Sequence, residues 1–541
     1  MKVIERMKRS IIHPFLLALF PVLSLFVRNA EQLAFREAIG TVIAVSIFAV
    51  SLWLLVGYVV KNRNKSAIIV SASLVSFFSY GHVLLVLAAV LYRTQILREA
   101  SLLLLASKSV SLAYLVAWCV LLGAVFYLTM KTASDLCLIT QFLNILSVSV
   151  IVAVAANWCY VRARADEVSV YIDSWQKNAH LEKPTNSVTP GSLPDIYYII
   201  LDGYARADIL KEMYQVDNSE LLSYLTEKGF YVANESRANY CQTGLSLASS
   251  LNLTYLDGLV SQIGNGSSNR LPLAVMIENN RVVRHLRDYG YTMAVFSTGY
   301  SITEIASADV RMSPCWSLNA FQNKLINATP LPVFLELPFL KTQRDFHRER
   351  ILYTLDHLAD ATEIDGPTFV FAHIVAPHPP FVFGAHGEHV QLDREYAFGM
   401  FTLADGSHFT AIAGKDEYVR SYRNQLAFIS ARLQIAIEEI LSRSPEPPII
   451  IIQADHGPGS MLDWQSAQDS SLPERMSILN AYHFPDQDYG ALYQGITPVN
   501  TFRVLLNGYF GTGYEILEDK SYFSLIDRPY SFIDVTDKVT K

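Results

Sequence analysis

The sequence has little charge for its length of 541 residues. Charged residues make up 17% of the chain, whereas about 25% is usual for a soluble domain. The formal net charge of −7 is small, and no run of lysine and arginine occurs. The lack of a basic stripe excludes a nucleic-acid-binding protein. The low charge comes mainly from the first 160 residues, because the remainder has the mixed composition of a globular domain.

Cysteine is scarce as well, with five residues and no CxxC pair or zinc-finger spacing. Cys119, Cys137 and Cys159 lie in apolar segments, where we expect them to be buried as small apolar side chains. Cys241 and Cys315 lie in the globular part. They would form a disulfide only if their Cα atoms came close together, and the sequence leaves this open.

Long apolar runs, by contrast, fill the first 160 residues. A membrane span needs about 20 mostly apolar residues. The first run follows a basic stretch but has no small-residue cleavage site after it, so we expect it to be retained and not removed as a signal peptide. We predict five transmembrane helices, at Ile12–Val27, Gly40–Val60, Ala67–Leu91, Val110–Met130 and Leu136–Val161.

Basic residues between these runs predict the orientation in the membrane. Loops rich in lysine and arginine face the cytoplasm, and the N-terminus, Lys61–Lys65 and Lys131 fall on one side. An odd number of spans then places everything after Val161 outside the cytoplasm. The basic loop at residues 93–108 opposes this assignment. Few ionisable residues lie within the spans, which favours an anchor over a transporter. The alternative is a platform that presents lipid to the outer domain.

The rest of the chain alternates between predicted strands and helices. A polar segment rich in Pro, Ser and Asn, residues 162–193, is expected to link the membrane domain, 1–161, to an outer domain, 194–541. This alternation predicts a doubly wound α/β domain with a mostly parallel sheet. The expected strands are Ile196–Leu201, Tyr291–Phe296, Thr368–Ile374 and Pro448–Ile452. The expected helices are Ile209–Lys228, Arg281–Tyr289 and Tyr418–Ser442.

Polar residues stand at or directly after the end of each predicted strand. Parallel sheets bind ligands at the carboxyl ends of their strands, so we expect these residues to form an active site. Aspartate and histidine suit zinc or manganese, which makes Asp202, Asp455 and His456 candidate metal ligands. The polar groups are Asp202-Gly203, Ser297-Thr298-Gly299, His373, His378 and Asp455-His456-Gly457.

A threonine precedes the predicted helix start at Leu245–Leu251. Thr243 would lie at the N-terminus of that helix, where free N–H groups and the helix dipole stabilise a phosphoryl group. One interpretation is that Thr243 only caps the helix. The other is that it is a nucleophile, since a hydroxyl near a metal ion loses its proton more readily.

The order of these motifs resembles a known group of enzymes. Asp202-Gly203, then Thr243-x-x-Ser-Leu, His378-Pro-Pro-Phe and Asp455-His456-Gly457 are similar to motifs of the sulfatase-like branch of the alkaline phosphatase superfamily. Several N-terminal spans before such a domain are typical of lipoteichoic acid synthases and lipid A phosphoethanolamine transferases. The resemblance implies an alkaline phosphatase-like fold and one divalent metal ion, zinc or manganese, held by Asp202, Thr243, Asp455 and His456.

The resemblance also implies roles for the other residues. Thr243 would be the nucleophile, His378 would contact the substrate, and His373 is a weaker candidate for the same role. Asp202 stands where these transferases commonly have glutamate. No Cys/Ser-x-Pro-x-Arg motif surrounds Thr243, so sulfate-ester hydrolysis is not expected, and no Asp-x-x-x-His pattern indicates a second metal. We interpret His483 as a surface-loop residue, with a site role as the alternative.

The function implied by the resemblance is a transferase in the cell membrane with its catalytic domain in the periplasm or outside the cell. It would move a substituted phosphoryl group from a membrane phospholipid to an envelope glycan or lipid, through a phospho-threonine intermediate. The alternatives are a phosphodiesterase or sulfatase-like hydrolase with the same site, and a non-catalytic envelope-assembly protein. The sequence leaves the headgroup, the acceptor and the metal open.

Overall fold

The computed structural model divides the chain into two compact units. The helical unit comprises Met1–Asp166, Leu318–Gln343 and Leu392–Phe401. The outer unit comprises Glu167–Ser317, Arg344–Gln391 and Thr402–Lys541. The structure describes residues 10–29, 35–93, 108–134, 136–178, 193–315, 318–335, 341–390 and 405–539.

Four helices of the helical unit are long and apolar enough to cross a membrane, within the described ranges. The first of the five predicted spans, Ile12–Val27, corresponds to α2, which is apolar but only 16 residues long. The number of spans therefore stays a prediction. The helices of this unit are α2 (His13–Arg28), α3 (Phe35–Val60), α4 (Arg63–Arg93), α6 (Lys108–Lys131), α7 (Cys137–Asn178), α14 (Ala320–Asn327) and α15 (Leu331–Leu335). The spanning segments are Ala38–Val60, Arg63–Val83, Ala113–Lys131 and Cys137–Ala163.

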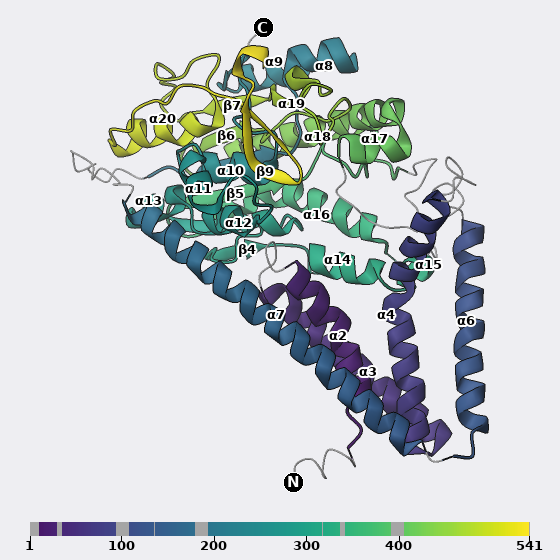
Figure 1. Ribbon diagram of the computed structural model, residues 1–541. Coiled ribbons are helices and arrows are strands. Elements are labelled where there is room, and N and C mark those ends of the chain that lie inside the picture. The colour runs from purple at the N-terminus through teal and green to yellow at the C-terminus, as the bar shows by residue number, and fades with distance from the viewer. Residues whose placement is uncertain are drawn as a thin grey trace. The chain divides into compact units, whose positions relative to one another are not determined.

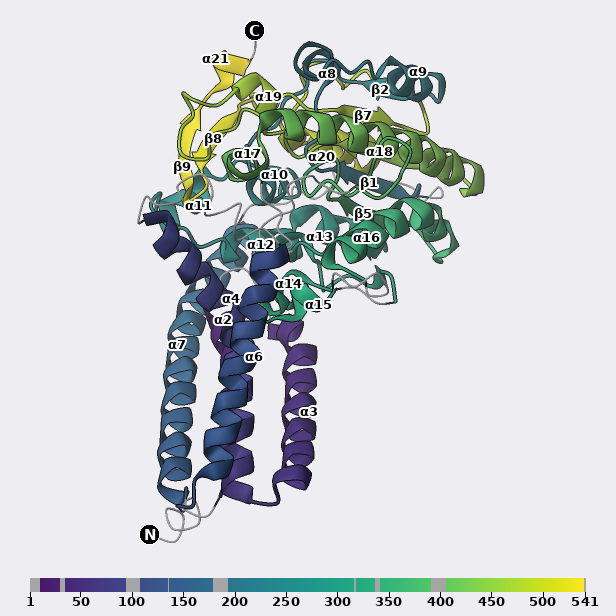
Figure 2. The same ribbon diagram turned by 90° about the vertical axis from the view of Figure 1, so that its right-hand side faces the viewer.

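Figure 2 shows the long helices α3, α4, α6 and α7, and large apolar side chains on each of them are exposed. α2 packs against α3 and α4, and α4 packs against α6. A buried polar cluster joins the start of α2 to α4 and α7. Nδ1 of the fully buried His13 lies 2.6 Å from Ser71 Oγ, while Asn144 Oδ1 accepts the His13 N–H at 3.0 Å. Buried polar side chains such as these are few among the described residues of the helical unit. The exposed apolar side chains of its helices suit a lipid environment.

One helix extends well past the predicted last span. α7 is continuous for 42 residues and ends at Asn178 (Figure 1). The start of the predicted linker, from residue 162, is thus helical. The rest of the linker, 179–192, lies outside the described residues, and the boundaries at 161 and 193 stay predictions.

The expectation that the cysteines of the apolar segments are buried is wrong for two of them. Cys119 and Cys159 are exposed on α6 and α7 and not buried, because these helices turn small and apolar side chains toward their surroundings. All five cysteines are free. Cys241 is buried with its Sγ 3.5 Å from the carbonyl oxygen of Ser524, whereas Cys315 is exposed, so the two do not form a disulfide.

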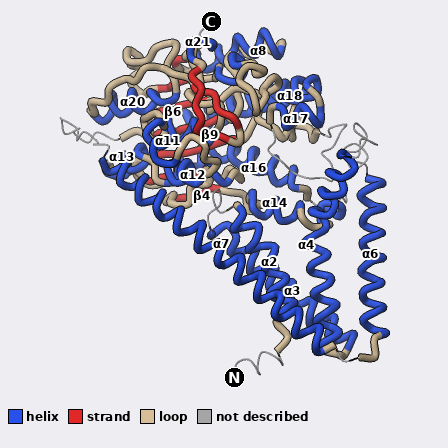
Figure 3. The backbone as a smooth tube through the Cα atoms, in the orientation of Figure 1, coloured by secondary structure: helices blue, strands red, loops and turns tan. Residues whose placement is uncertain are grey.

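The outer unit is built around a seven-stranded sheet, as far as it is described, with the order β2-β7-β6-β1-β5-β3-β4. β7 runs antiparallel to β2 and to β6, and the other strand pairs of the sheet are parallel, so the predicted mostly parallel α/β fold is confirmed. Figure 3 shows the strands gathered in the interior of this unit. The sheet strands are β1 (Ile196–Leu201), β2 (Tyr231–Val232), β3 (Thr292–Phe296), β4 (Val310–Met312), β5 (Thr368–Ile374), β6 (Ile449–Gln453) and β7 (Asn480–His483). A separate hairpin consists of β8 (Tyr522–Leu525) and β9 (Arg528–Asp534).

Helices connect these strands and cover the sheet. Tyr198 of β1 packs its ring 5.0 Å from that of Phe502 on α20, and both faces of β1 are buried, as in parallel sheets covered by helices. The α-helices of the outer unit are α8 (Ala207–Tyr214), α9 (Ser219–Glu227), α10 (Thr243–Ser250), α11 (Asp257–Ile263), α12 (Leu271–Glu278), α13 (Arg281–Asp288), α16 (Gln343–His357), α17 (Ser407–Ala413), α18 (Lys415–Arg443), α19 (Leu472–Met476), α20 (Pro498–Phe510) and α21 (Thr536–Val539). Two short 3-10 helices are η1 (Ser301–Thr303) and η2 (Leu358–Glu363).

The four predicted strands are present to within one residue at each end. The single helix predicted over Ile209–Lys228 is wrong, because the chain breaks it into α8 and α9. Gln215, which follows the last residue of α8, lies in the left-handed region with φ of 53°. A residue in this conformation ends a helix. The apolar spacing continues across the break, which is why the pattern looked unbroken.

Candidate active site

The register of three neighbouring strands, β5, β1 and β6, positions the site residues. β1 lies between β5 and β6, with Ile200 level with His373 on one side and with Gln453 on the other. Asp202 follows β1 directly, and its N–H donates to the Ile374 carbonyl at 3.0 Å. Asp455 comes two residues after β6. The three carboxyl ends therefore bring these side chains to one edge, as the sequence predicted.

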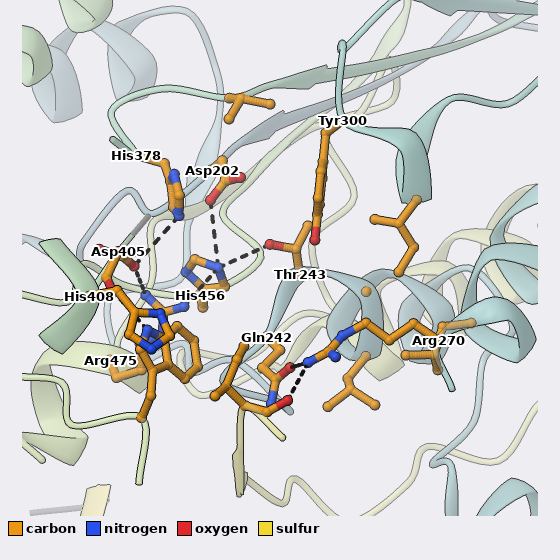
Figure 4. Close-up of a pocket in the computed structure, with 17 residues that line it drawn as sticks. Asp202, Gln242, Thr243, Arg270, Tyr300, His378, Asp405, His408, His456 and Arg475 are labelled. Atoms are coloured by element: carbon orange, nitrogen blue, oxygen red, sulfur yellow. Dashed lines mark hydrogen bonds and ion pairs between the residues drawn. The ribbon is translucent and has the colours of Figure 1, made fainter. Parts of the chain in front are cut away.

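The imidazole of His456 lies among the predicted metal-ligand residues (Figure 4). Its Nε2 is 3.3 Å from Asp455 Oδ2 and 3.6 Å from Asp202 Oδ1. On the far side of Asp202, His373 Nε2 lies 3.3 Å from Oδ2. All four residues are buried. Asp202, His373 and Asp455 each offer one ligand atom within 4.8 Å of the others. His373 thus belongs to this cluster, whereas the predicted ligand His456 is not one of its three members.

The cluster has the features of a cation site. Asp202 Oδ1, Asp455 Oδ2 and His373 Nε2 are buried and accept or donate no hydrogen bond among the described residues. Orphaned buried polar atoms of this kind are rare in folded proteins and call for a partner. His456 Nδ1 donates to the Gly457 carbonyl at 3.0 Å, which leaves the Nε2 lone pair facing the carboxylates. A backbone contact that fixes the histidine tautomer in this way is typical of metal ligands. The donor set fits zinc or manganese.

Two glycines stand next to the candidate ligands, one with a positive φ and one with a close backbone neighbour. Gly203 has φ of +75°, and a Cβ there would lie 3.6 Å from His378. At Gly457 a Cβ would come within 2.0 Å of the Glu474 carbonyl oxygen. A side chain at position 457 would therefore displace the segment that carries His456, whereas one at position 203 would strain the backbone beside Asp202 through its positive φ.

Thr243 is the first residue of α10, and its hydroxyl is turned to the ligand cluster and not to its own helix. Oγ1 donates to His456 Nε2 at 3.1 Å. The N-cap residue is Gln242, which makes no side-chain cap bond. The capping interpretation of Thr243 is therefore wrong, because a cap would lie one residue earlier and bond to backbone N–H groups. The hydroxyl lies at the positive end of a helix and beside the candidate ligands.

Sequence reasoning missed a buried arginine beside these residues. Arg475 is 1% exposed and comes from the short helix α19. Its Nη1 pairs with Asp405 Oδ2 at 2.7 Å, and its Nη2 lies 3.1 Å from His456 Nε2. Asp405 also faces His378, whose Nε2 is 3.6 Å away. Neither Asp405 nor Arg475 follows a predicted strand, so no pattern in the sequence pointed to them.

The charges of the site stabilise one another. Burial opposes the ionisation of Asp202, but His378 and the other nearby histidines outweigh it and lower the pKa of this carboxyl. Burial also opposes the ionisation of Asp405, but the positive charge of Arg475 outweighs this effect, and the pKa of Asp405 is lowered. Burial and the charge of Arg475 lower the pKa of His456, which keeps the ring neutral and its lone pair available. Burial lowers the pKa of His378, but the negative charges of Asp202 and Asp405 raise it by more. The pKa of His378 is therefore raised.

A pocket of about 150 Å³ opens over Thr243. Asp202, His378 and His456 line one part of it, together with Asp405 and Arg475. His373 is not among the lining residues and lies behind Asp202. The pocket residues that sequence reasoning did not single out include Arg270, Tyr300, His408 and Trp464.

His483 does not belong to the site. It is the last residue of β7, is buried, and is level with Ile450 near the start of β6. The site lies at the other end of β6. Nδ1 of His483 donates to the Pro448 carbonyl at 2.9 Å, so the expectation of a surface loop is wrong and the residue is a satisfied buried histidine.

Comparison with known proteins finds no matching family model and no matching curated protein. Solved structures do resemble the chain. The C-terminal periplasmic domain of EcEptC from Escherichia coli, in complex with Zn, has 10% identity and a TM-score of 0.42, covering 66% of this chain and 96% of that one. The integral membrane lipooligosaccharide phosphoethanolamine transferase A from Neisseria meningitidis has 12% identity and a TM-score of 0.37, covering 92% and 95%.

A phosphonate monoester hydrolase from Agrobacterium radiobacter is also similar, with 12% identity and a TM-score of 0.39 over 61% of this chain and 80% of that one. The chain is thus similar to solved phosphoethanolamine transferases and a related hydrolase, the kind of protein that its motifs resemble. Likenesses this distant assign no substrate and no residue role, so we base the function on the site itself.

Proposed function

We propose that the chain is a metal-dependent enzyme that transfers a substituted phosphoryl group through Thr243. The observation that carries the proposal is the position of the Thr243 hydroxyl, 3.1 Å from His456 Nε2. It stands at the first turn of a helix and opens into a pocket. A buried hydroxyl that contacts a candidate ligand has no structural need for this position, but a nucleophile does.

The candidate ligands are Asp202, Asp455 and His456, with Thr243 as the fourth and His373 close enough to replace one of them. A divalent ion held there would lower the proton affinity of a hydroxyl and neutralise charge on phosphoryl oxygens. Zinc and manganese both suit this donor set. One ion is proposed, because Arg475 already neutralises Asp405, the next carboxylate in the pocket.

Thr243, His378 and Arg475 each have a role in the proposed transfer. Thr243 Oγ1 gives up its proton and attacks phosphorus, so that the bond from Oγ1 to phosphorus forms. The bond from phosphorus to the leaving oxygen breaks, and that oxygen takes up a proton to give diacylglycerol. The N–H groups of the first turn of α10 stabilise the phosphoryl oxygens. His378 and the guanidinium of Arg475 line the same pocket and would donate hydrogen bonds to those oxygens. An acceptor hydroxyl then displaces Thr243 and takes the substituted phosphoryl group.

The donor we propose is a membrane phospholipid, and the acceptor is a glycan or lipid of the cell envelope. The apolar helices support a donor that resides in the membrane, since they would hold the chain where such a lipid is found. The outer unit would lie outside the cytoplasm, in accordance with the basic loops. A hydrolase would share every step except the last, in which water takes the place of the acceptor.

Purified full-length chain in detergent micelles with zinc tests this proposal. The chain is incubated with phospholipids labelled in the headgroup phosphate, and diacylglycerol and the label are followed. We expect Thr243-dependent release of diacylglycerol, with the label passing to an added envelope glycan or lipid fraction. Label that appears only as free headgroup phosphate would establish the hydrolase instead.

The matched control is Ser246→Ala. Ser246 lies one turn further along α10, is 1% exposed, and its hydroxyl has no partner among the described residues. Diacylglycerol release should vanish in Thr243→Ala and persist in Ser246→Ala. Equal release by both variants would contradict a role for Thr243.

A further inference from the structure

The pocket has a second wing, on the side of Thr243 away from His378 and Asp405 (Figure 4). Arg270, at the N-terminus of α12, and Tyr300, in the loop after β3, supply its polar groups. The apolar side chains of Leu273, Ile302 and Ile526 also line the pocket, and the Ile526 carbonyl accepts a hydrogen bond from Arg270. The wing thus combines a small apolar wall with one cation and one hydroxyl, and it belongs to no step described above.

Arg270 is held in place by neutral groups. Its Nη2 donates to Gln242 Oε1 at 2.6 Å and to the Ile526 carbonyl at 2.8 Å. No carboxylate of the described residues forms an ion pair with it, and none of them accepts a hydrogen bond from its Nε or Nη1. A guanidinium has five N–H donors, so three remain for a ligand. Because Gln242 directly precedes Thr243, these donors are anchored beside the attacking hydroxyl.

Tyr300 offers a further donor. It is half-buried, and its hydroxyl bonds to none of the described residues. Burial raises the pKa of this hydroxyl, and the nearby Arg270 only partly offsets the effect, so it stays protonated at neutral pH. Of the other charged groups of the pocket, Asp202 belongs to the candidate metal cluster, and Asp405 and Arg475 pair with each other. Arg270 is the lining cation that has no counter-ion in the described structure.

We propose that Arg270 and Tyr300 bind an anionic substituent on the transferred phosphoryl group, such as a carboxylate or a second phosphate, and disfavour a cationic amine. The inference rests on the proposed function. In-line displacement puts the leaving oxygen on the far side of phosphorus from Thr243. A wing that begins beside Thr243 therefore faces the group that stays on phosphorus. An unpaired guanidinium attracts an anion there and repels an ammonium group.

Three small substrates of nearly equal size separate the charges. Each is a p-nitrophenyl phosphodiester whose second ester group is carboxymethyl, 2-hydroxyethyl or 2-aminoethyl, and release of p-nitrophenolate by the full-length, zinc-loaded chain is measured. We expect kcat/KM to fall in that order, with at least about tenfold between the first and the last, since a hydrogen bond to a charged group is typically worth that much.

Variants show whether Arg270 causes the order. Arg270→Gln should bring the carboxymethyl and aminoethyl values close together, Arg270→Glu should reverse them, and Tyr300→Phe should slow the carboxymethyl ester most. The control is Arg287→Gln, an exposed arginine on α13 paired with Asp309, which should keep the wild-type order. The ratio between substrates is unaffected by a general loss of folded protein, so it reports selectivity even in a poorly folding variant.

Two failures are distinguishable. If Thr243→Ala still releases p-nitrophenolate from all three esters at the wild-type rate, the proposed function is wrong. If release needs Thr243 but the aminoethyl ester is preferred, or if Arg270→Gln leaves the ratio unchanged, the proposed function stands and the anionic subsite is overturned.

Discussion

The helical unit and the outer unit distribute polar and apolar side chains in opposite ways. α3, α6 and α7 turn Ile47, Val120 and Ile145 outward, each at least 60% exposed. In the outer unit the exposed surface is mixed, and ionised groups such as Asp202 and Arg475 are buried. Exposed apolar surface has a low cost only in lipid, and buried charge persists only when it is paired or has a function. The contrast therefore separates a unit whose surface suits a lipid environment from the unit that carries the candidate site.

The largest expected effect is on the buried ligand cluster. Asp455→Ala combined with His456→Ala should abolish bound zinc, because two of the candidate ligands are removed. The fold should remain, since both residues stand at a strand edge. The control is Asp360→Ala combined with His357→Ala, an aspartate–histidine pair of similar chemistry that lies partly exposed on the surface. Elemental analysis and circular dichroism measure the two outcomes. Full metal content in the Asp455/His456 variant would disprove the ligand assignment.

The next largest effect concerns the stability that a buried ion pair and an exposed ion pair each contribute. Arg475→Met leaves Asp405 buried without its cation, which should cost about 3–5 kcal/mol in the free energy of unfolding. Arg443→Met breaks an exposed pair with Asp360 and should cost less than about 1 kcal/mol. Denaturant unfolding of the two variants compares them. Equal losses would show that burial of the pair has no special role.

A smaller effect concerns the apolar surface. Ile47→Lys places a charge on the outward face of α3, near the middle of a candidate span, and should disfavour membrane insertion by about 2.5–3.5 kcal/mol. Ile435→Lys puts the same charge on α18 of the outer unit, where the isoleucine is 46% exposed, and should be neutral. The amount of each variant in the membrane fraction is the readout. If both variants insert equally well, α3 does not face lipid at this position.

The sequence predicted the parts of the site that follow strands. Asp202, Asp455 and His456 come after apolar runs whose parallel pairing is almost forced by the alternation with helices, so their convergence was foreseeable. Thr243 was foreseeable as the start of a helix, but its orientation toward His456 was not. A helix pattern fixes which residue comes first and leaves the rotamer to tertiary packing.

The residues that were missed come from loops and short helices. Asp405 and Arg475 are far apart in the sequence and meet only because their side chains are buried together. Arg270 precedes α12 in an ordinary polar stretch. Nothing in periodicity or spacing marks such positions, since their roles depend on which groups they face. The break between α8 and α9 was missed for a related reason, because a single left-handed residue leaves the apolar pattern intact.

The central claim is that Thr243 carries a phosphoryl group during turnover. Full-length chain exposed to phospholipid, quenched in acid and digested, is examined by peptide mass spectrometry for an adduct on the Thr243 peptide. We predict a substituted phosphoryl adduct on this residue in the wild type, a reduced amount on serine in Thr243→Ser, and none in Thr243→Ala, together with loss of lipid turnover in the last. Near-normal turnover by Thr243→Ala, without any adduct in the wild type, would contradict the account.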